Sequence, residues 1–371
     1  MQERNESQQS MVLEKEPAKK LKFGKNNGFQ PELRRRVDEL FLSNNLKKHD
    51  CPQMYFKTAV LLLSFFGLYS VLVFVAQTWW QVIPLCIMLG VVTAGIGFSI
   101  QHDGAHHAYS NSLWVNKLMS MSLDLIGGSS YIWHWKHDVL HHTYVNIAGY
   151  DMDLEVGLFG RLSPSHPRLA FHRWQHYYLW MLYGLLAIKW HFYDDFYCLI
   201  AGKIGDRTYP RPKQGNLAIF FGGKLIFFTM ALAIPLLSHS VLQVLASYGL
   251  VAVTLGIVLS VVFQLAHVVE EASFPMPVGE ICAIENDWAV HQIETTVNFS
   301  RNNALVTWLL GGLNFQIEHH LFPNICHVNY PEISRIVEQT CQEYGVKYNQ
   351  HGSFWLGCVS HFRWLRRMGA S

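Results

Sequence analysis

Nine histidines are grouped in a way that is typical of metal binding. Eight of them form three short clusters, at residues 102–107, 137–142 and 316–320, and the ninth follows a long apolar run. The nine are His102, His106, His107, His137, His141, His142, His267, His319 and His320. Imidazoles spaced i, i+4 and i+5 lie near one face of a helix, so a cluster can direct several nitrogens toward one point.

The number of imidazoles decides which kind of metal site to expect. Eight or nine ligands exceed the needs of a single tetrahedral zinc ion. They suit two transition-metal ions, and imidazole is a good ligand for iron. The clusters also lack the HExxH spacing of zinc proteases. The pattern therefore predicts a centre with two metal ions, and it favours iron.

Four polar side chains inside the clusters have roles that the sequence leaves open. Metal-bound imidazoles usually donate their second N–H to a carboxylate or carbonyl oxygen, so Asp103, Asp138 and Glu318 are candidates for that support. The alternative is that they are solvated loop carboxylates. Gln316 stands where the third cluster would hold a histidine. It either hydrogen-bonds to water or substrate, or lies on a helix surface.

Other residues beside the clusters are weaker candidates. Asp151 and Asp153 either orient a substrate headgroup or, slightly favoured, serve a loop or cap a helix. Several aromatic side chains could line a tunnel for an apolar chain, although aromatic residues are common at membrane interfaces without such a role. They are Trp133, Trp135, Tyr144, Trp288 and Phe315.

Long apolar segments must position these clusters. Residues 58–77 and 82–101 carry no charge, and each run is long enough to cross a hydrocarbon core of about 30 Å. Residues 217–237 and 240–266 form a second pair, interrupted only by Lys224. We therefore predict an all-α integral membrane protein with four transmembrane helices in two hairpins, together with interfacial helices and a cytoplasmic cap that holds the metals.

Two weaker apolar stretches, 113–132 and 177–192, are predicted to be interfacial. A span at 113–132 would put the first two clusters on opposite sides of the membrane, where they could not share metals. Lys and Arg are concentrated in the N-terminal segment, in residues 101–216 and in the C-terminal segment, whereas the connections at 78–81 and 238–239 contain none. The positive-inside rule then places the site and both termini in the cytoplasm.

Composition limits the remaining possibilities. Only 15% of the 371 residues are charged, against about a quarter in soluble domains, and the net charge of +2 gives no reason to expect a nucleic-acid partner. We expect residues 1–56 to form a cytoplasmic segment, disordered over 1–21 and without a signal peptide, and residues 57–371 to form the membrane domain. The seven cysteines show no CxxC pair and are expected to be reduced. Periodicity predicts a helix over 329–345.

The clusters resemble the histidine boxes of the membrane-bound fatty acid desaturases. HDGAHH, HDVLHH and QIEHH match the three boxes, and HHTYVN and HHLFPNICHVNYP extend the match. Glutamine in the third box is typical of the front-end subgroup, which inserts a double bond between an existing one and the carboxyl end. The resemblance covers about residues 20–369 and is strongest to the cyanobacterial-type Δ6 acyl-lipid (linoleoyl) desaturases.

This resemblance implies an O2-dependent oxidoreductase with two iron(II) ions. It would use two electrons to insert a cis double bond, at Δ6, into a polyunsaturated chain such as linoleoyl, carried by a lipid or by CoA. The nine histidines are the implied iron ligands, although one of His106 and His107 would lie just outside the ligand set. No HPGG haem motif occurs, so a separate ferredoxin or cytochrome b5 is the expected electron donor.

Three alternatives remain. A membrane di-iron hydroxylase of alkanes or lipids would share the boxes but return oxygen to carbon, and a Δ5 or Δ8 front-end desaturase would place the bond elsewhere. By resemblance, Gln316 and the LFPNICHVNYP stretch favour desaturation over hydroxylation. A metal transporter would need histidines within its spans, and residues 58–77 and 82–101 contain none.

Overall fold

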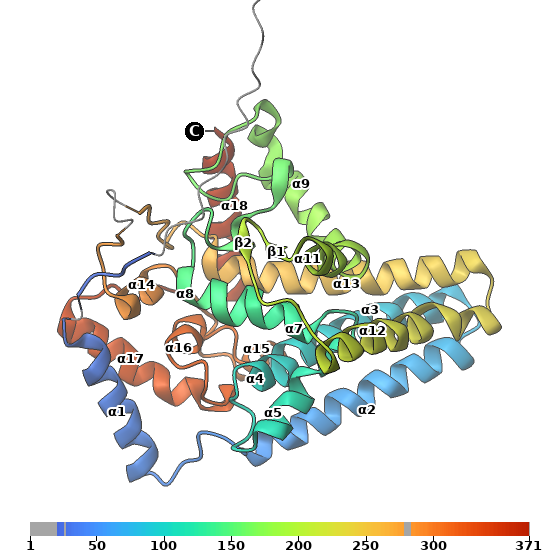
Figure 1. The fold of residues 1–371 in the computed structure, drawn as a ribbon, viewed down its shortest axis with the longest axis horizontal. Coiled ribbons are helices and arrows are strands. Elements are labelled where there is room, and N and C mark those ends of the chain that lie inside the picture. Colours follow the sequence, from blue (N-terminus) through green and yellow to red (C-terminus); the bar gives the residue numbers. More distant parts are fainter. Residues whose placement is uncertain (1–20, 26, 278–282, 371) are drawn as a thin grey trace, which may run out of the picture.

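The computed structural model describes residues 21–25, 27–277 and 283–370 of the chain. Long helices extend toward one side in Figure 1, and shorter helices cover one end of them as a cap. The predicted disorder of residues 1–21 concerns a segment that, apart from Leu21, lies outside the described residues, as does Cys282.

Within the described residues, four helices are long and apolar enough to cross a membrane, which confirms the predicted four spans. The first span is α2 (Pro52–Phe74), and the second is α3 (Trp79–Gly95) continued by η1 (Ile96–Gln101) and α4 (His102–Ala105). The third span is α12 (Gly215–Phe228) continued by η8 (Thr229–Ala233) and η9 (Pro235–Leu237), and the fourth is α13 (Val241–His267).

The first span begins six residues earlier than residue 58. Pro52 occupies the first position of α2, where its fixed φ suits a helix start and its missing N–H leaves no helical bond unmade. The charge that ends the apolar run does not end the helix, because Lys57 is buried and its Nζ lies 3.1 Å from His327 Nε2 in the cap.

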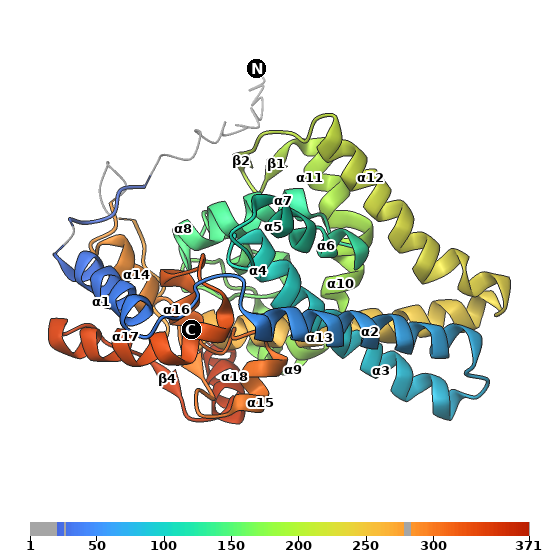
Figure 2. The same cartoon turned by 90° about the horizontal axis from the view of Figure 1, so that it is seen from below.

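Small residues allow the fourth span to pack closely against the second span and against the backbone at Tyr183 and Gly184. A Cβ added at Gly90 would lie 2.7 Å from Thr254 Cβ, and one added at Gly256 would lie 2.7 Å from the carbonyl oxygens of Tyr183 and Gly184. Such close backbone approach is typical of membrane helix interfaces, where van der Waals packing replaces the hydrophobic effect. The tight pairing of α3 with α13 brings the ends of both helices to the same place under the cap (Figure 2).

The segment between the hairpins supplies half of the cap. Its helices are α5 (Leu113–Ser120), α6 (Ser122–Leu125), α7 (Ser130–Trp133), η2 (His134–His141), α8 (His142–Tyr144), η3 (Met152–Leu154), η4 (Gly157–Phe159), η5 (Ala170–Trp174), α9 (Gln175–Leu182), η6 (Tyr183–Leu185), α10 (Leu186–Lys189), η7 (Trp190–Asp194) and α11 (Asp195–Ala201). β1 (Lys203–Ile204) pairs with β2 (Arg207–Thr208) in an antiparallel hairpin. Neither apolar stretch predicted to be interfacial is among the four spans.

The segment after the fourth span and the described N-terminal helix complete the cap. They contain α1 (Phe29–Ser43), α14 (Trp288–Glu294), β3 (Asn298–Phe299), α15 (Ala304–Leu309), α16 (Gln316–Leu321), η10 (His327–Asn329), α17 (Tyr330–Tyr344), β4 (Gln350–His351) and α18 (Phe354–Ala370). β3 and β4 pair in parallel. α17 confirms the helix predicted over 329–345, and Phe29, Leu33 and Val37 of α1 share a buried core with its apolar face (Figure 2).

A buried ion pair joins the third span to the cap. Lys224 Nζ lies 2.8 Å from Asp195 Oδ2 and donates to the Gly127 carbonyl oxygen at 2.6 Å. Trp190 Nε1 donates to the other carboxylate oxygen of Asp195 at 2.9 Å. Both charged side chains are almost fully buried, so each depends on the other for compensation.

We expect Lys224→Met to lower the free energy of unfolding by about 3–5 kcal/mol, because the Asp195 carboxylate would stay buried without its cation. The control is Lys189→Met, which breaks the exposed Lys189–Asp194 pair and should cost about 0–1 kcal/mol. Denaturant unfolding of the two variants in the same detergent measures the difference. Equal losses would contradict a structural role for the buried pair.

Candidate metal centre

Eight of the nine predicted histidines converge under the cap, where the spans end. Ring nitrogens of His102, His106, His137 and His319 lie within 4.8 Å of one another, and so do those of His141, His267 and His320. Nitrogens of His142, His319 and His320 form a further group that bridges these two. The arrangement is therefore two adjacent sets of imidazoles, linked by a third group that shares His319 with the first set and His320 with the second, and such a pair of sets suits a centre with two ions.

The second and fourth spans fix the depth of this centre. His102 continues the second span through α4, and His267 is the last residue of α13. Both rings are buried, and His102 Nε2 lies 3.2 Å from His137 Nε2 in the cap. The centre thus joins membrane helices to the cap segments on either side of the second hairpin (Figure 1).

An unusual helical winding brings three histidines of the second cluster together. η2 is a π-helix, and the N–H of His142 donates to the carbonyl oxygen of His137, five residues earlier. In an α-helix, residues five apart point about 140° away from each other, so the expectation that positions i and i+5 share a face does not hold for that winding. The wider π-helical turn, with its i→i+5 bond, brings them closer to one face. The ring centres of His141 and His142 consequently lie 5.1 and 4.9 Å from that of His137.

The first cluster has the same spacing but delivers only two rings. α4 ends at Ala105, and His106 caps it with its ring inside the centre. His107 has a left-handed φ of 58° and an exposed side chain, outside all the groups of converging nitrogens. Of the adjacent pair that the resemblance left open, the structure thus directs His106 inward and His107 outward.

Asp151 orients one imidazole from behind. Its carboxylate oxygens lie 3.1 and 3.2 Å from His141 Nδ1, and they also accept the backbone N–H groups of Asn146 and Asp153. An imidazole that donates Nδ1–H to a buried carboxylate presents its Nε2 lone pair to a metal. Asp153 lies farther from the same nitrogen, at 3.5 Å.

Neutral partners hold three other rings in the same manner. His320 Nδ1 lies 2.9 Å from Gln292 Oε1, His319 Nδ1 lies 3.3 Å from the Tyr330 hydroxyl, and His267 Nδ1 lies 3.3 Å from the Thr295 carbonyl oxygen. Sequence inspection does not find these partners, because they come from α14, the segment after it and α17, which carry no cluster of their own.

The three carboxylates inside the clusters contact other groups. Asp103 Oδ2 lies 2.9 Å from Nδ1 of His327, which was not among the predicted ligands, and Glu318 accepts hydrogen bonds from Tyr348 and Asn298. Asp138 Oδ2 lies 2.9 Å from His134 Nδ1, and its other oxygen lies 3.6 Å from His106 Nε2. Among them only Asp138 approaches a converging imidazole, and it does so beyond hydrogen-bond distance.

The protonation of these rings fits metal binding. For the His141 ring, burial is outweighed by the charge and hydrogen bond of Asp151 together with the charge of Asp153, and the pKa is raised. Burial lowers the pKa values of the five other rings in the cap well below the usual range, and neighbouring imidazoles add to the effect. These rings are His106, His137, His142, His319 and His320. They are neutral near pH 7, so lone pairs are available, as coordination requires.

Several of these nitrogens are buried without a hydrogen-bond partner. They include His106 Nε2, His319 Nε2 and both ring nitrogens of His142. An unsatisfied buried nitrogen costs about 1–3 kcal/mol, and coordination would satisfy one nitrogen of each ring. Nitrogen-rich sets of this kind suit transition metals, so the residues present fit two such ions.

Gln316 is buried in the second set of imidazoles. Its Nε2 lies 3.0 Å from His267 Nε2 and 3.4 Å from His320 Nε2, while its Oε1 has no partner. The side chain therefore faces the centre and does not lie on the helix surface. An amide at this place can hydrogen-bond to a molecule bound between the two rings.

We expect Gln316→Leu to lower activity at least about tenfold while the chain keeps its metals, because a buried polar contact is worth about 1–3 kcal/mol. Gln316→His restores a nitrogen at the same place and should recover most of the loss. Turnover and metal content of the two variants test this expectation. Full activity in Gln316→Leu would show that the amide is dispensable.

Only some of the predicted aromatic residues reach the centre. The Trp133 ring stacks on His137 with centroids 4.5 Å apart, and on its other side it packs 5.3 Å from Trp190. Trp288 Nε1 donates to the His142 carbonyl oxygen at 3.4 Å, and Phe315 is buried directly before Gln316. Trp135 and Tyr144 contact other rings: Trp135 contacts His134, and Tyr144 contacts Phe23 and Tyr150.

A helical protein with four membrane spans and a buried set of converging imidazoles at their ends belongs to the class of histidine-rich membrane oxidoreductases. The fatty acid desaturase family profile matches residues 78–352, and the chain belongs to this family. It is similar to an sn-1 linoleoyl-lipid 6-desaturase from Synechocystis sp., with 37% identity over 95% of this chain and 98% of the relative.

Two other relatives extend the comparison. An sn-1 linoleoyl-lipid 6-desaturase from Arthrospira platensis is 38% identical over 94% of this chain and 95% of its own length. An acyl-lipid (8-3)-desaturase from Physcomitrium patens is 36% identical over 93% of this chain but only 72% of its own length. The chain is thus a fatty acid desaturase, and both bacterial relatives match it nearly end to end.

Proposed function

We propose that this desaturase inserts a cis double bond at the Δ6 position of a linoleoyl chain carried by a membrane glycerolipid. The observation that carries the proposal is the similarity, over 94–95% of the chain, to two relatives named as sn-1 linoleoyl-lipid 6-desaturases. Gln316, whose amide is buried within the third histidine cluster, is typical of the front-end desaturases, and this supports a bond on the carboxyl side of an existing one.

Two iron ions are the proposed cofactor. His102, His106, His137 and His319 would hold one, and His141, His267 and His320 the other, with His142 between them. When bound, the irons supply the O2-dependent oxidation that removes one hydrogen atom from each of two neighbouring methylenes. Gln316, Asp138 and Asp151 are proposed to act beside the ligands, whereas Asp103 and Glu318 are proposed to hold the surrounding cap segments.

The remaining task of the protein is to position the acyl chain and keep water out. The imidazoles are buried, so an oxidising centre would be shielded from solvent. Trp133, Trp190 and Phe263 form an apolar wall beside His137, against which a methylene chain can lie. Which bond reacts then depends on the distance from the anchored headgroup to the metals.

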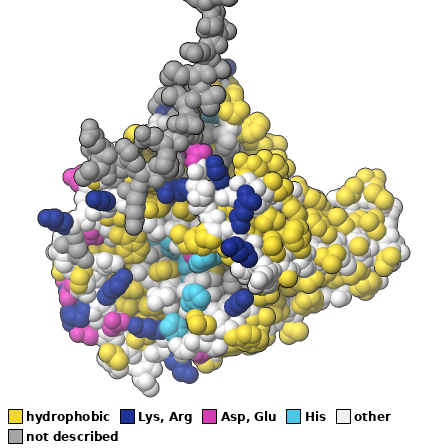
Figure 3. Space-filling model, in the orientation of Figure 1, with side chains coloured by type: hydrophobic (Ala, Val, Ile, Leu, Met, Phe, Trp, Pro, Cys, Tyr) yellow, Lys and Arg dark blue, Asp and Glu magenta, His cyan; other side chains and the backbone are white. Residues whose placement is uncertain are grey.

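We place the site and both termini on the cytoplasmic side. Lys and Arg side chains gather over the cap in Figure 3, whereas the projecting hairpins are covered by hydrophobic side chains. This distribution agrees with the positive-inside rule. The two electrons would come from a separate ferredoxin or cytochrome b5 that reaches the cap from the same side.

The test is fatty-acid analysis after expression in a host that lacks Δ6 products and contains a ferredoxin or cytochrome b5 system. Cells are fed linoleate, and double bonds are mapped by gas chromatography and mass spectrometry. A γ-linolenate peak that disappears in His142→Ala supports the proposal. A hydroxylated product would overturn the reaction type, and a bond at another position would overturn Δ6.

A further inference from the structure

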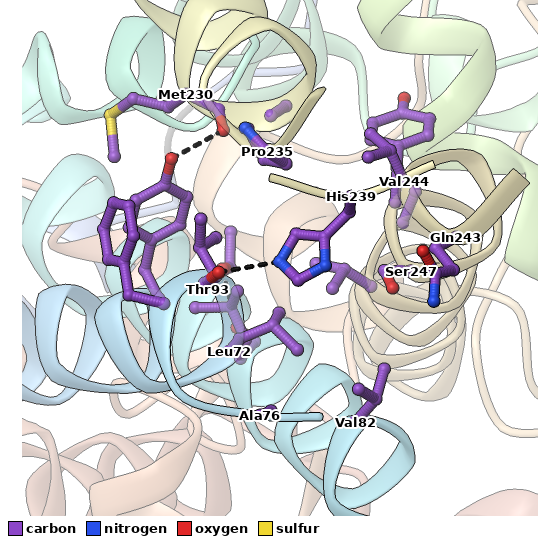
Figure 4. A pocket seen from close by; sticks show the side chains of 18 of the residues that line it. Leu72, Ala76, Val82, Thr93, Met230, Pro235, His239, Gln243, Val244 and Ser247 are labelled. Carbon is purple, nitrogen blue, oxygen red and sulfur yellow. Dashed lines mark hydrogen bonds between the residues drawn. The ribbon is translucent and has the colours of Figure 1, made fainter. Parts of the chain in front are cut away.

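A cavity of about 390 Å³ lies between the two hairpins (Figure 4), and none of the converging imidazoles lines it. Its lining extends from Trp79 to Thr93 along the second span and from Gln243 to Leu255 along the fourth. At about 1.5 Å per residue, these stretches are roughly 18–21 Å long. The cavity is therefore long and narrow, and it runs along the spans.

The end of the cavity away from the cap carries more polar side chains than the inner end, where His191 lies. Side chains such as Leu72, Val82 and Val251 make its body apolar. Polar side chains gather at the end formed by the two inter-span connections, opposite the cap. They are Gln77, Thr78, Ser238, His239 and Gln243. This pattern matches a molecule with a long apolar chain and a polar head.

Two hydrogen bonds tie the hairpins together across this space. The Tyr69 hydroxyl donates to the Met230 carbonyl oxygen at 2.8 Å, and His239 Nε2 lies 2.7 Å from the Val73 carbonyl oxygen (Figure 4). In an α-helix, the Met230 carbonyl oxygen would accept the N–H of Ile234. Because η8 is a π-helix, that N–H bonds to the Thr229 carbonyl oxygen, and the Met230 oxygen can accept the Tyr69 hydroxyl.

These two hydrogen bonds limit which kind of molecule can occupy the cavity between the hairpins. Packed helices need about 8–10 Å between their axes, so a helix from a second copy cannot pass between hairpins that are tied at two levels. A single hydrocarbon chain is thin enough to do so. An apolar slot at membrane depth is surrounded by lipid tails, which are the most abundant molecules of that shape.

The inner end of the cavity is separated from the metal centre by aromatic rings. His191 and Ile126 line that end, and Trp190 follows directly behind them in η7. Trp190 packs on Trp133, which in turn stacks on His137. A chain in the cavity is therefore not the chain that lies at the imidazoles.

We propose that the cavity binds one acyl chain of a bilayer glycerolipid, whose polar head lies at the His239 end in the leaflet opposite the cap. The bound chain fills the space between the hairpins and helps to set their spacing. The proposal rests on the four spans and the cavity alone, and it is independent of the reaction that the metal centre performs.

A matched pair of variants isolates the cavity. Ala231 lines it, whereas Ala233, in the same π-helix, is exposed and outside it. The full chain is reconstituted in phosphatidylcholine nanodiscs that contain a phosphatidylcholine with a photoreactive diazirine near the end of one acyl chain. After illumination, labelled peptides are identified by mass spectrometry, and thermal melting confirms that each variant is folded.

We expect labelling of the peptides around Leu89 and Val251 that excess unlabelled phosphatidylcholine suppresses. Labelling should fall at least fivefold in Ala231→Trp and remain unchanged in Ala233→Trp. Equal labelling of both variants would overturn the proposal. So would labelling of the Leu89 and Val251 peptides that only linoleoyl lipid suppresses, because the cavity would then receive the substrate.

Native mass spectrometry of the unmodified chain gives a second, variant-free measurement. Detergent-purified protein should retain one glycerolipid molecule after extensive washing. Protein that is entirely stripped of lipid, or that occurs as a dimer without lipid, would contradict the proposal. Neither measurement depends on desaturation, so failure of the proposed Δ6 activity and failure of the lipid site are distinguishable.

Discussion

His106→Ala is expected to abolish desaturation and to lower the metal content, whereas His107→Ala leaves both unchanged. The two histidines are adjacent in one sequence motif, but only the His106 ring lies among the converging imidazoles. His107 is exposed, with a left-handed backbone that turns its side chain outward. Metal analysis of the purified variants, together with product analysis in cells, measures both effects.

The pair of variants serves as its own control for folding and expression, because the same substitution is made at neighbouring positions. Activity that survives in His106→Ala and is lost in His107→Ala would overturn the assignment of the first cluster. Loss of activity in both, with normal metal content in His107→Ala, would assign His107 to substrate or electron transfer.

Asp151→Asn is expected to weaken metal binding about 10–100-fold, which is the usual effect of removing a group that orients a ligand. The Asp151 carboxylate contacts His141 Nδ1 and two backbone N–H groups, so an amide cannot satisfy all of these donors. Competition with a metal chelator measures the affinity of each variant, and turnover at saturating metal separates weak binding from a slower reaction.

Asp153→Asn is the matched control for this change. Its carboxylate lies 3.5 Å from the same nitrogen, is partly exposed and also pairs with Lys136 at 2.9 Å. We expect a much smaller change in metal affinity. If the two substitutions weaken metal binding equally, Asp151 and Asp153 together hold the His141 ring, and Asp151 has no special role.

Much of the fold could be predicted from the sequence because the bilayer restricts what an apolar run can become. Uncharged runs of about 20 residues must be spans, and the argument that the first two clusters share metals excludes a span at 113–132. The ends of the spans were less predictable. The helix of the first span continues past Lys57 because the buried ammonium group of this residue has a hydrogen-bond partner in His327, which is distant in the sequence.

The centre itself could be predicted as a set of histidines but not as a geometry. Spacing alone treats the clusters at 102–107 and 137–142 as equivalent, yet one delivers two rings and the other three. The difference lies in helical winding, which depends on where each helix ends and what packs beside it. Gln292 and Tyr330 were not predictable, because a lone amide or phenol carries no spacing signal.

The scattered origin of the imidazoles has a consequence for biogenesis. His102 and His267 belong to different hairpins, and His319 and His320 follow all four spans in the chain. A nascent chain that has inserted its first hairpin therefore holds an incomplete set of donors. Metal loading must follow insertion of the second hairpin and folding of the cap, so the metal supply acts on a fully inserted protein.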